Sequence, residues 1–295
     1  MNISDLQREF KQYALMEKGI MPKTYKSIWG SVRQLAEYGK SNELTDLDLV
    51  TVKGFLYAGR SEKGWASQTF RNHWQYLKIF FDWCLRKEYL RVHPVIDIER
   101  PKPTKQLPRF ITSADAQKIL YHTAWYKWRY RLEKPRNEAI ITTLLMTGIR
   151  LQELLNLLVH DVNLSNETIF VRQGKNRKDR ILPIHPQLSP ILRTYVHEKR
   201  QFSRASLWFF SGIKSEKQLN QKDVRTVCKK ITIASGVKFT PHMLRHTFAR
   251  EMVNQDFNLY KLQQILGHAQ ISTTQIYLSV STAGIKRSFD EVKLF

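Results

Sequence analysis

Residues 240–277 bring histidine, arginine and tyrosine side chains together in one stretch of the chain, among them His242, Arg245, His268 and Tyr277. It reads T-P-H-M-L-R-H-T, then about twenty residues with a helical pattern, then L-G-H-A-Q-I-S-T-T-Q-I-Y. His242 and Arg245 are three residues apart, so on a helix they share a face. His268 and Tyr277 follow on either side of a short polar turn. Cations and imidazoles around a tyrosine are the groups that attack on a phosphodiester requires.

A second cationic motif, T-G-I-R-L-Q-E-L-L-N-L, covers residues 147–157. Gly148 can end one helix in the left-handed conformation. Arg150 then lies at the first turn of the next helix, near free amide donors, which is a favourable place for an anion. Glu153 is one helical turn further on, where it can steady Arg150. The alternative is a structural ion pair at a helix start.

Residues 168–184 give the clearest strand signal, two β-branched runs on either side of Q-G-K-N-R-K. The pattern predicts a hairpin whose tip carries Lys175, Arg177, Lys178 and Arg180. Basic hairpin tips are usually solvated loops. A lysine on such a tip can also enter a groove and donate a proton to a leaving oxygen.

The sequence lacks the residues that several other reaction types require. The chain has no H-E-x-x-H or Cys/His cluster for zinc, no G-x-x-x-x-G-K-[ST] for ATP, and no carboxylate cluster for a pair of magnesium ions. Attack by a tyrosine needs no metal if cations bind the non-bridging phosphate oxygens. The resulting phosphotyrosine stores the bond energy, so resealing needs no ATP. We therefore expect no cofactor.

The overall charge is strongly positive. Among 295 residues, 48 Lys and Arg stand against 26 Asp and Glu, for a net charge of +22, and 42% of residues are hydrophobic. The length favours two domains with packed cores, and the charge favours a polyanionic partner, most often nucleic acid. A protein that is merely basic is the alternative.

The composition also bears on location. The two cysteines, Cys84 and Cys228, cannot form a disulfide framework or a zinc site, which suits a reducing cytoplasm. The N-terminal residues do not resemble a signal peptide, and no apolar run approaches membrane-spanning length. We expect a cytoplasmic, nucleoid-associated protein without membrane contact.

The N-terminal part, residues 1 to about 93, has the pattern of a helical bundle. Pro22 lies near the start of its second helix, Thr45 is a plausible N-cap for the third, and the fourth runs from about Ser67 to Lys87. Basic residues lie between the apolar positions: Lys53, Arg60, Lys63, Arg71, His73, Lys78, Arg86 and Lys87. They form either a solvated surface or contacts to a DNA backbone.

Residues 94–110 are rich in proline and basic residues, which predicts a semi-rigid linker. A second domain follows from 111 to 295. Thr112 and Ser113 can cap its first helix, and later helices are expected at about 187–200, 220–234, 241–254, 258–266 and 272–279. A last amphipathic helix, about 282–295, packs on its own domain or docks on a neighbouring subunit.

Taken together, these motifs resemble the tyrosine recombinases, the family of phage integrases and Xer-type resolvases. The matching stretches are T-G-I-R-L-Q-E-L, Q-G-K-N-R-K-D-R, T-P-H-M-L-R-H-T-F-A and L-G-H-A-Q-I-S-T-T-Q-I-Y, in the family's order and at ordinary spacing. The resemblance implies a mostly α fold with a small β-hairpin or sheet. It implies a helical core-binding domain that clamps DNA and a mixed α+β catalytic domain.

The resemblance also implies residue roles. Tyr277 resembles the nucleophile that forms a 3′-phosphotyrosyl link, and Arg150 and Arg245 resemble the pair that binds the non-bridging oxygens. His242 resembles the histidine that assists proton movement, and His268 the residue that hydrogen-bonds the phosphate. The remaining positions are Lys175 as the hairpin lysine that protonates the leaving 5′-oxygen, with Lys178 close by, Glu153 as a supporting acid, and His246 as a structural residue.

The function implied is site-specific recombination through a Holliday junction, without metal or ATP. The implied partner is double-stranded DNA with inverted-repeat sites, bound by a homo- or hetero-tetramer through the C-terminal helix. The helical pattern begins near residue 1, which favours a Xer-like resolvase or a simple integrase of a mobile element. A type IB topoisomerase and a non-catalytic DNA-binding protein on the same scaffold are the alternatives.

Overall fold

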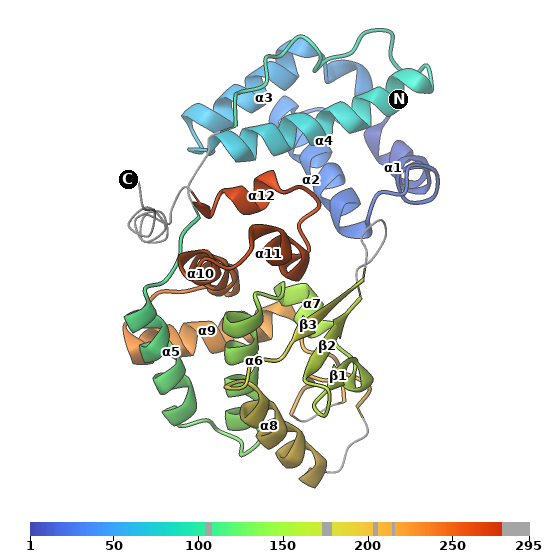
Figure 1. Cartoon of the computed structure of the whole chain (residues 1–295). Coiled ribbons are helices and arrows are strands. Elements are labelled where there is room, and N and C mark those ends of the chain that lie inside the picture. Colours follow the sequence, from blue (N-terminus) through green and yellow to red (C-terminus); the bar gives the residue numbers. More distant parts are fainter. Residues whose placement is uncertain (104–107, 173–178, 203–205, 214–215, 279–295) are drawn as a thin grey trace, which may run out of the picture. The chain divides into compact units, whose positions relative to one another are not determined.

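The computed structural model describes residues 1–103, 108–172, 179–202, 206–213 and 216–278. The chain divides into two compact units, Met1–Gln106 and Leu107–Phe295. This division lies inside the segment 94–110 for which the sequence predicts a linker. Most of the described residues are helical and one small sheet is present, which confirms the predicted fold class (Figure 1).

The first unit is a bundle of four α-helices with an aromatic core. Phe10, Phe80 and Trp83 are fully buried at its centre, and their rings lie 5.2–5.9 Å apart. Apolar residues at helical spacing bury one face of each helix, which is why the sequence pattern located them. The helices are α1 (Ile3–Gln12), continued by the π-helical turn Tyr13–Glu17, α2 (Pro22–Gly39), α3 (Leu49–Ser61) and α4 (Ser67–Arg86).

The start of α3 differs from the prediction. Its N-cap is Asp48, whose carboxylate accepts the backbone N–H of Thr51 at 2.8 Å. Thr45 instead lies within a 3₁₀ turn, Leu44–Asp46. Both residues can cap a helix, but an aspartate satisfies the first-turn amides and also favours the positive helix end. The prediction that Thr45 caps this helix was wrong.

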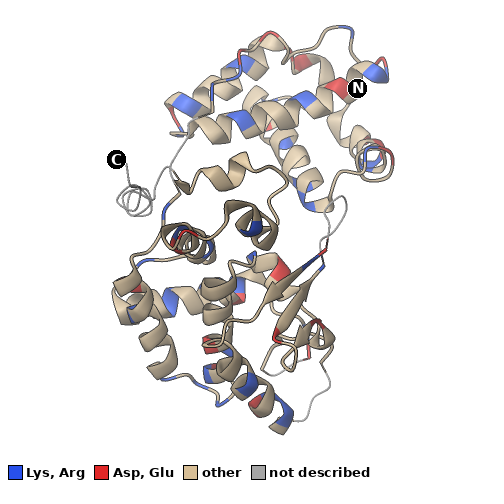
Figure 2. Cartoon of the chain, in the orientation of Figure 1, with Lys and Arg blue, Asp and Glu red and all other residues tan. Residues whose placement is uncertain are grey.

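Lys and Arg residues are spread over the helices of the first unit (Figure 2), and not all of its basic residues are exposed. His73 is half-buried: its ring stacks on Trp65 with centroids 4.2 Å apart, and its Nδ1 lies 2.9 Å from Ser31 Oγ. Lys78 forms an ion pair with Asp82 at 2.8 Å. By contrast, the side chains of Lys53, Arg60, Lys63, Arg86 and Lys87 are exposed.

The chain after α4 continues to pack on the first unit beyond residue 93. Val95 and Ile98 are buried in its core, and the Trp74 indole N–H donates to the Ile98 carbonyl at 2.8 Å. Arg71 donates to the carbonyl of Pro101. The first part of the predicted linker is therefore attached to the bundle.

The second unit is built around α6 (Glu133–Thr147), most of whose residues from Ala139 to Leu144 are fully buried. Buried side chains, most of them apolar in its middle, lie on every side of this helix, so neighbouring elements must cover all of its faces. Its neighbours are α5, α8 and α10 (Figure 1). The helices are α5 (Ser113–Trp125), α6, α7 (Leu151–Leu155), α8 (Ser189–Gln201), α9 (Gln221–Ser235), α10 (Pro241–Asn254), α11 (Leu259–Leu266) and α12 (Ser272–Gln275), with a 3₁₀ turn at Val159–Asp161.

A three-stranded antiparallel sheet completes the second unit. Its order is β1 (Val162–Asn163), β2 (Thr168–Val171) and β3 (Arg180–Pro183), with Val171 opposite Arg180 at the end nearest the hairpin tip. The two long strands confirm the predicted hairpin. Its tip, 173–178, lies outside the described residues.

Local capping signals account for two helix ends near the site. The Thr112 hydroxyl accepts the Asp115 N–H at 3.1 Å and begins α5, as predicted. Gly148 ends α6 with φ of 62°, the left-handed conformation also predicted from the sequence. A Cβ there would lie 2.4 Å from Phe248 Cδ1, so the close packing of α6 and α10 also requires glycine.

Within the described residues, no helix combines the length and apolar character needed to cross a membrane.

Candidate active site

Arg150 begins α7 and is fixed by contacts on both sides. Its Nη1 donates to Glu153 Oε1 at 2.8 Å, and its backbone N–H donates to Glu153 Oε2 at 3.0 Å. Its Nη2 donates to the carbonyl of Gly267 at 2.8 Å, at the end of α11. Arg150 is therefore held between two elements, and its side chain remains 28% exposed.

Glu153 is the acidic centre of this cluster. A second arginine, Arg180 of β3, donates to Glu153 Oε2 at 2.7 Å and to the Ile265 carbonyl at 2.7 Å. Burial would raise the pKa of the Glu153 carboxyl, but the hydrogen bonds and charges of Arg180 and Arg150 outweigh it and lower the pKa to about 2. Glu153 thus steadies Arg150, as expected, and joins α7 to β3 as well.

The sequence analysis placed Arg180 at the hairpin tip and gave it no part in the site, whereas its side chain is buried against Glu153. Leu182 is fully buried, and side chains two residues apart on a strand share a face. This parity places Arg180 on the inner side of β3, where its side chain is 9% exposed. A buried cation in a strand requires a buried anion, and Glu153 supplies it.

Arg245 lies on α10 and is 3% exposed. It donates to the Gly148 carbonyl at 2.5 Å and to the Leu266 carbonyl at 2.7 Å. Burial and the neighbouring Arg150 lower its pKa to about 9, so the guanidinium stays charged at neutral pH. The second arginine of the predicted pair is therefore held mainly by helix-end carbonyls.

His268 follows α11 and joins Arg245 to the last described helix. Arg245 Nη2 lies 3.0 Å from His268 Nε2, and His268 Nδ1 lies 2.9 Å from Thr274 Oγ1. An arginine N–H can only donate, so Nε2 is the acceptor and Nδ1 carries the proton that is given to Thr274. The ring is neutral in this arrangement, because burial and the charges of Arg245 and Arg150 lower its pKa to about 4.

Tyr277 follows α12 and is 3% exposed. Its ring packs among Ala249, Val253, Leu262 and Leu266, and it lies nearly parallel to the His268 ring with centroids 6.5 Å apart. Burial raises the pKa of the phenol, while the charges of Arg245 and Arg150 act in the opposite direction.

The polar partner of Tyr277 is His246, which the sequence analysis treated as structural. The Tyr277 hydroxyl lies 2.7 Å from His246 Nδ1. His242 is one helical turn earlier on α10, and its ring meets the His246 ring edge-on with centroids 4.2 Å apart. The i, i+4 spacing of the two histidines was the signal available in the sequence.

The structure thus brings Arg150, Glu153, Arg245, His268 and Tyr277 into one linked cluster, formed by α7, α10, α11 and the segment after α12 (Figure 1). His242 lies beside it through His246. Burial and the charges of Arg245 and Arg150 lower the pKa of His242 too. An anion that reached these arginines would find a neutral imidazole and a phenol next to it.

Two predicted elements cannot be placed. Lys175 and Lys178 belong to the hairpin tip, outside the described residues, and so does the helix expected at about 282–295. Arg180 and Arg172, which flank the tip in sequence, are described. Arg172 forms an ion pair with Asp161 at 2.5 Å.

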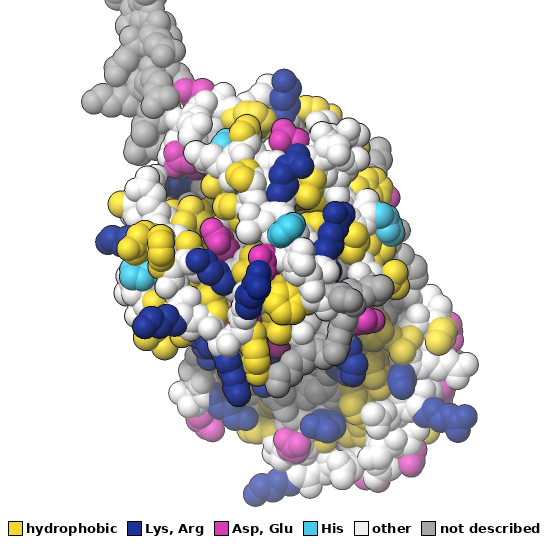
Figure 3. Space-filling view, turned by 90° about the horizontal axis from the view of Figure 1, so that it is seen from below, with side chains coloured by type: hydrophobic (Ala, Val, Ile, Leu, Met, Phe, Trp, Pro, Cys, Tyr) yellow, Lys and Arg dark blue, Asp and Glu magenta, His cyan; other side chains and the backbone are white. Residues whose placement is uncertain are grey.

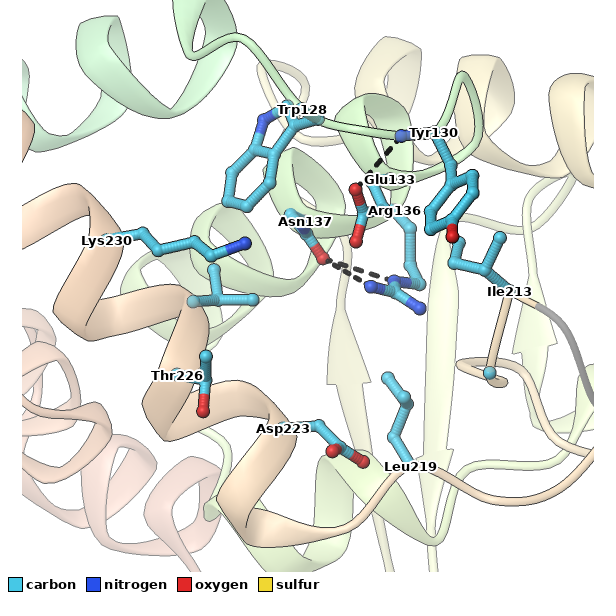
Figure 4. A pocket seen from close by; sticks show the side chains of 12 residues that line it. Trp128, Tyr130, Glu133, Arg136, Asn137, Ile213, Leu219, Asp223, Thr226 and Lys230 are labelled. Atoms are coloured by element: carbon cyan, nitrogen blue, oxygen red, sulfur yellow. Dashed lines mark hydrogen bonds between the residues drawn. The ribbon is translucent and has the colours of Figure 1, made fainter.

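A separate cavity of about 330 Å³ lies between α6, α9 and the segments around Trp128 and Ile213 (Figure 4). Its buried Arg136 donates to Asn137 Oδ1 at 3.0 and 3.1 Å and to the Ser211 carbonyl at 3.2 Å. Arg136 is in the first turn of α6, and Gly148 follows its last residue, so the two ends are roughly 20 Å apart along the helix axis. The cavity is therefore distinct from the Arg245–Tyr277 cluster.

Comparison with known proteins identifies the family of this chain. The sequence model of the phage integrase family matches residues 109–283. Tyrosine recombinase XerA of Pyrococcus furiosus is 34% identical over 197 residues, 67% of this chain and 66% of that protein. Tyrosine recombinase XerA of Thermococcus kodakarensis is 30% identical over 287 residues, 97% of this chain and 94% of that protein.

A solved structure shares the fold. It is the XerH site-specific recombinase bound to palindromic difH substrate in a post-cleavage complex, with a TM-score of 0.75 and 20% identity, covering 90% of this chain and 79% of that one. The family match lies within the second unit and includes every described residue of the cluster, and the Thermococcus relative extends the similarity to 97% of the chain. This chain belongs to the phage integrase family and is a Xer-like tyrosine recombinase.

Proposed function

We propose that this recombinase cuts and rejoins DNA at specific sites through a covalent link between Tyr277 and a 3′-phosphate. The observation that supports this most is the cluster itself. A buried phenol lies in the same unit as two arginines that are fixed by helix-end carbonyls, with neutral His268 joined to Arg245. Fixed cations beside a nucleophile stabilise the charge that develops on a phosphate under attack.

The proposed step balances without metal or ATP. The Tyr277 oxygen forms a bond to phosphorus as the bond to the 5′-oxygen breaks, and Arg150 and Arg245 bind the non-bridging oxygens. The phenol proton leaves toward His242, and Lys175 protonates the 5′-oxygen. Attack by the free 5′-hydroxyl of a second duplex reverses the step and, repeated on the other strands, passes through a Holliday junction.

The proposed partner is double-stranded DNA with inverted-repeat sites, which the protein binds at the nucleoid in the cytoplasm. The net charge of +22 supports this partner. Lys and Arg side chains are scattered among apolar, uncharged and some acidic side chains in the view of Figure 3. Dispersed cations are sufficient for contact with a phosphate backbone. We assign the helical bundle of the first unit to DNA clamping and the second unit to catalysis.

The test of the nucleophile is Tyr277→Phe on a nicked site that traps the covalent intermediate. We expect loss of the protein–DNA adduct with the Kd for the site unchanged within about twofold, because the phenol ring is kept and no DNA-binding cation is removed. Phe257→Tyr, a change on the same unit that adds a hydroxyl, serves as the control. Adducts formed by Tyr277→Phe at the wild-type rate would show that another residue attacks.

We further propose assembly as a tetramer on DNA through the helix expected at about 282–295. Removal of Ile285 and the residues after it should then impair synapsis of two sites more than binding to one. The measurement is native gel mobility of single-site and paired complexes. Paired complexes formed equally well by the truncated chain would contradict this mode of assembly.

A further inference from the structure

We propose that His246 is a positioning residue for Tyr277, holding the phenol hydroxyl through a hydrogen bond to Nδ1. The inference rests on the proposed role of Tyr277 as nucleophile, and it gives a positioning role to a residue that the sequence motifs mark only as structural. Its basis is the 2.7 Å contact between the two side chains.

The surroundings of Tyr277 leave its hydroxyl few partners. The ring is packed by apolar side chains of α10 and α11, among them Ala249 and Leu262. A buried phenol hydroxyl requires a polar partner, and among the described contacts of Tyr277 its hydroxyl meets His246. One hydrogen bond therefore sets the direction in which the hydroxyl points.

The protonation states agree with this direction. The phenol keeps its proton at neutral pH because burial raises its pKa. His246 is neutral, since burial, His242 and Arg245 lower its pKa to about 4. Tyr277 therefore donates and His246 Nδ1 accepts.

Its place on α10 makes His246 suited to positioning. It directly follows Arg245, so one rigid helix carries both the buried guanidinium and the acceptor for the phenol. On the other side, the ring of His268 lies against Tyr277 and is itself fixed by Arg245 and Thr274. The nucleophile is thus aligned with the arginine through side chains whose own positions are determined by the packed unit.

The test uses three replacements of His246 that differ in where they place an acceptor. Asn puts its carbonyl oxygen near the position of Nδ1, Gln reaches instead toward that of Nε2, and Ala has neither. We expect the rate of adduct formation on a nicked site to fall about 10- to 100-fold in His246→Ala, the range for a lost buried hydrogen bond. His246→Asn should recover to within about fivefold of the wild-type rate, while His246→Gln should resemble His246→Ala.

A second readout does not depend on activity. With 3-fluorotyrosine at position 277, the ¹⁹F resonance of the DNA-free protein should shift in His246→Ala and return toward the wild-type position in His246→Asn. His197→Asn, an exposed histidine on α8, is the matched control and should change neither the rate nor the resonance. The affinity for the DNA site and the Tm are measured for every variant, and they show whether a lower rate of adduct formation results from misfolding.

Each possible result of these experiments either supports or overturns the proposed role of His246. Equal rates for wild type, Ala and Asn variants would overturn the inference, as would an Asn variant as slow as Ala with its resonance restored. An unchanged ¹⁹F resonance in His246→Ala would show that the contact is absent. If Tyr277→Phe still forms adducts, the proposed nucleophile fails, whereas the ¹⁹F result reports on the contact itself.

Discussion

The guanidinium of Arg245 donates to the carbonyl of Gly148, a residue 97 positions earlier in the chain. Arg150, two residues after Gly148, in turn donates to the carbonyl of Gly267. Both glycines end helices in the left-handed conformation, with φ of 62° and 64°. Both arginines are therefore fixed at the turn that ends α11, Arg150 by Gly267 and Arg245 by Leu266, and Arg245 is fixed by the turn that ends α6 as well.

Gly148→Ala should lower both stability and activity. The left-handed conformation alone costs a residue with a Cβ about 1–2 kcal/mol, and the contact with Phe248 adds a further overpacking cost of about 1–3 kcal/mol. Movement of the Gly148 carbonyl would also displace Arg245. Denaturant unfolding and the rate of adduct formation measure the two effects.

Gly236→Ala is the matched control for this change. Gly236 also ends a helix, with φ of 72°, but nothing lies within 4 Å of a Cβ built there. It should show the conformational cost of about 1–2 kcal/mol without loss of adduct formation. Similar losses of stability and activity in the two variants would argue against close packing at Gly148.

Glu153→Gln should destabilise the protein at neutral pH and less so in acid. The folded-state pKa of about 2 lies below the ordinary value of 4.5. The ionised carboxylate therefore contributes stability above about pH 4.5, and this contribution is lost as the pH falls toward 2. This lowering of the Glu153 pKa corresponds to about 3 kcal/mol in the free energy of unfolding.

The measurement is the free energy of unfolding of wild type and Glu153→Gln between pH 3 and 7. The difference should be largest at pH 7 and narrow below about pH 4.5. Glu216→Gln, an exposed glutamate on the same unit, should differ little from wild type at any pH. A difference that is constant across the range would mean that the Glu153 pKa is not lowered.

Thr274→Val should slow adduct formation by removing the acceptor for the His268 Nδ1 proton. The change conserves shape at a fully buried position and leaves one imidazole N–H without its partner. We expect about a 3- to 10-fold lower rate on a nicked site, the range for one neutral hydrogen bond. Thr273→Val, a change at the exposed neighbouring residue, is the control. Equal rates for the two variants would show that Thr274 has no role in the site.

Local signals explain which parts of the fold could be predicted. Caps and breakers such as Thr112 and Gly148 act on their immediate neighbours, so the sequence located the ends of α5 and α6 correctly. Asp48 and Thr45 are both capable caps only three residues apart, and Asp48 caps α3 because its charge also favours the positive helix end.

The contacts of the site also divide into those that local spacing predicts and those that depend on packing. Arg150 and Glu153 are neighbours on one helix, so their ion pair followed from spacing. The contacts of Arg180 with Glu153 and of His246 with Tyr277 join residues 27 and 31 positions apart. Such contacts depend on how β3, α10 and α12 pack, which no short motif specifies.

The way Arg245 is held has a consequence for electroneutrality at the site. Backbone carbonyls satisfy its hydrogen-bonding geometry but supply only partial charge, whereas Glu153 is shared between Arg150 and Arg180. Three guanidiniums thus face one carboxylate in this cluster of described residues. The folded protein carries this excess positive charge before any ligand arrives, and a bound phosphodiester would act as its counter-ion.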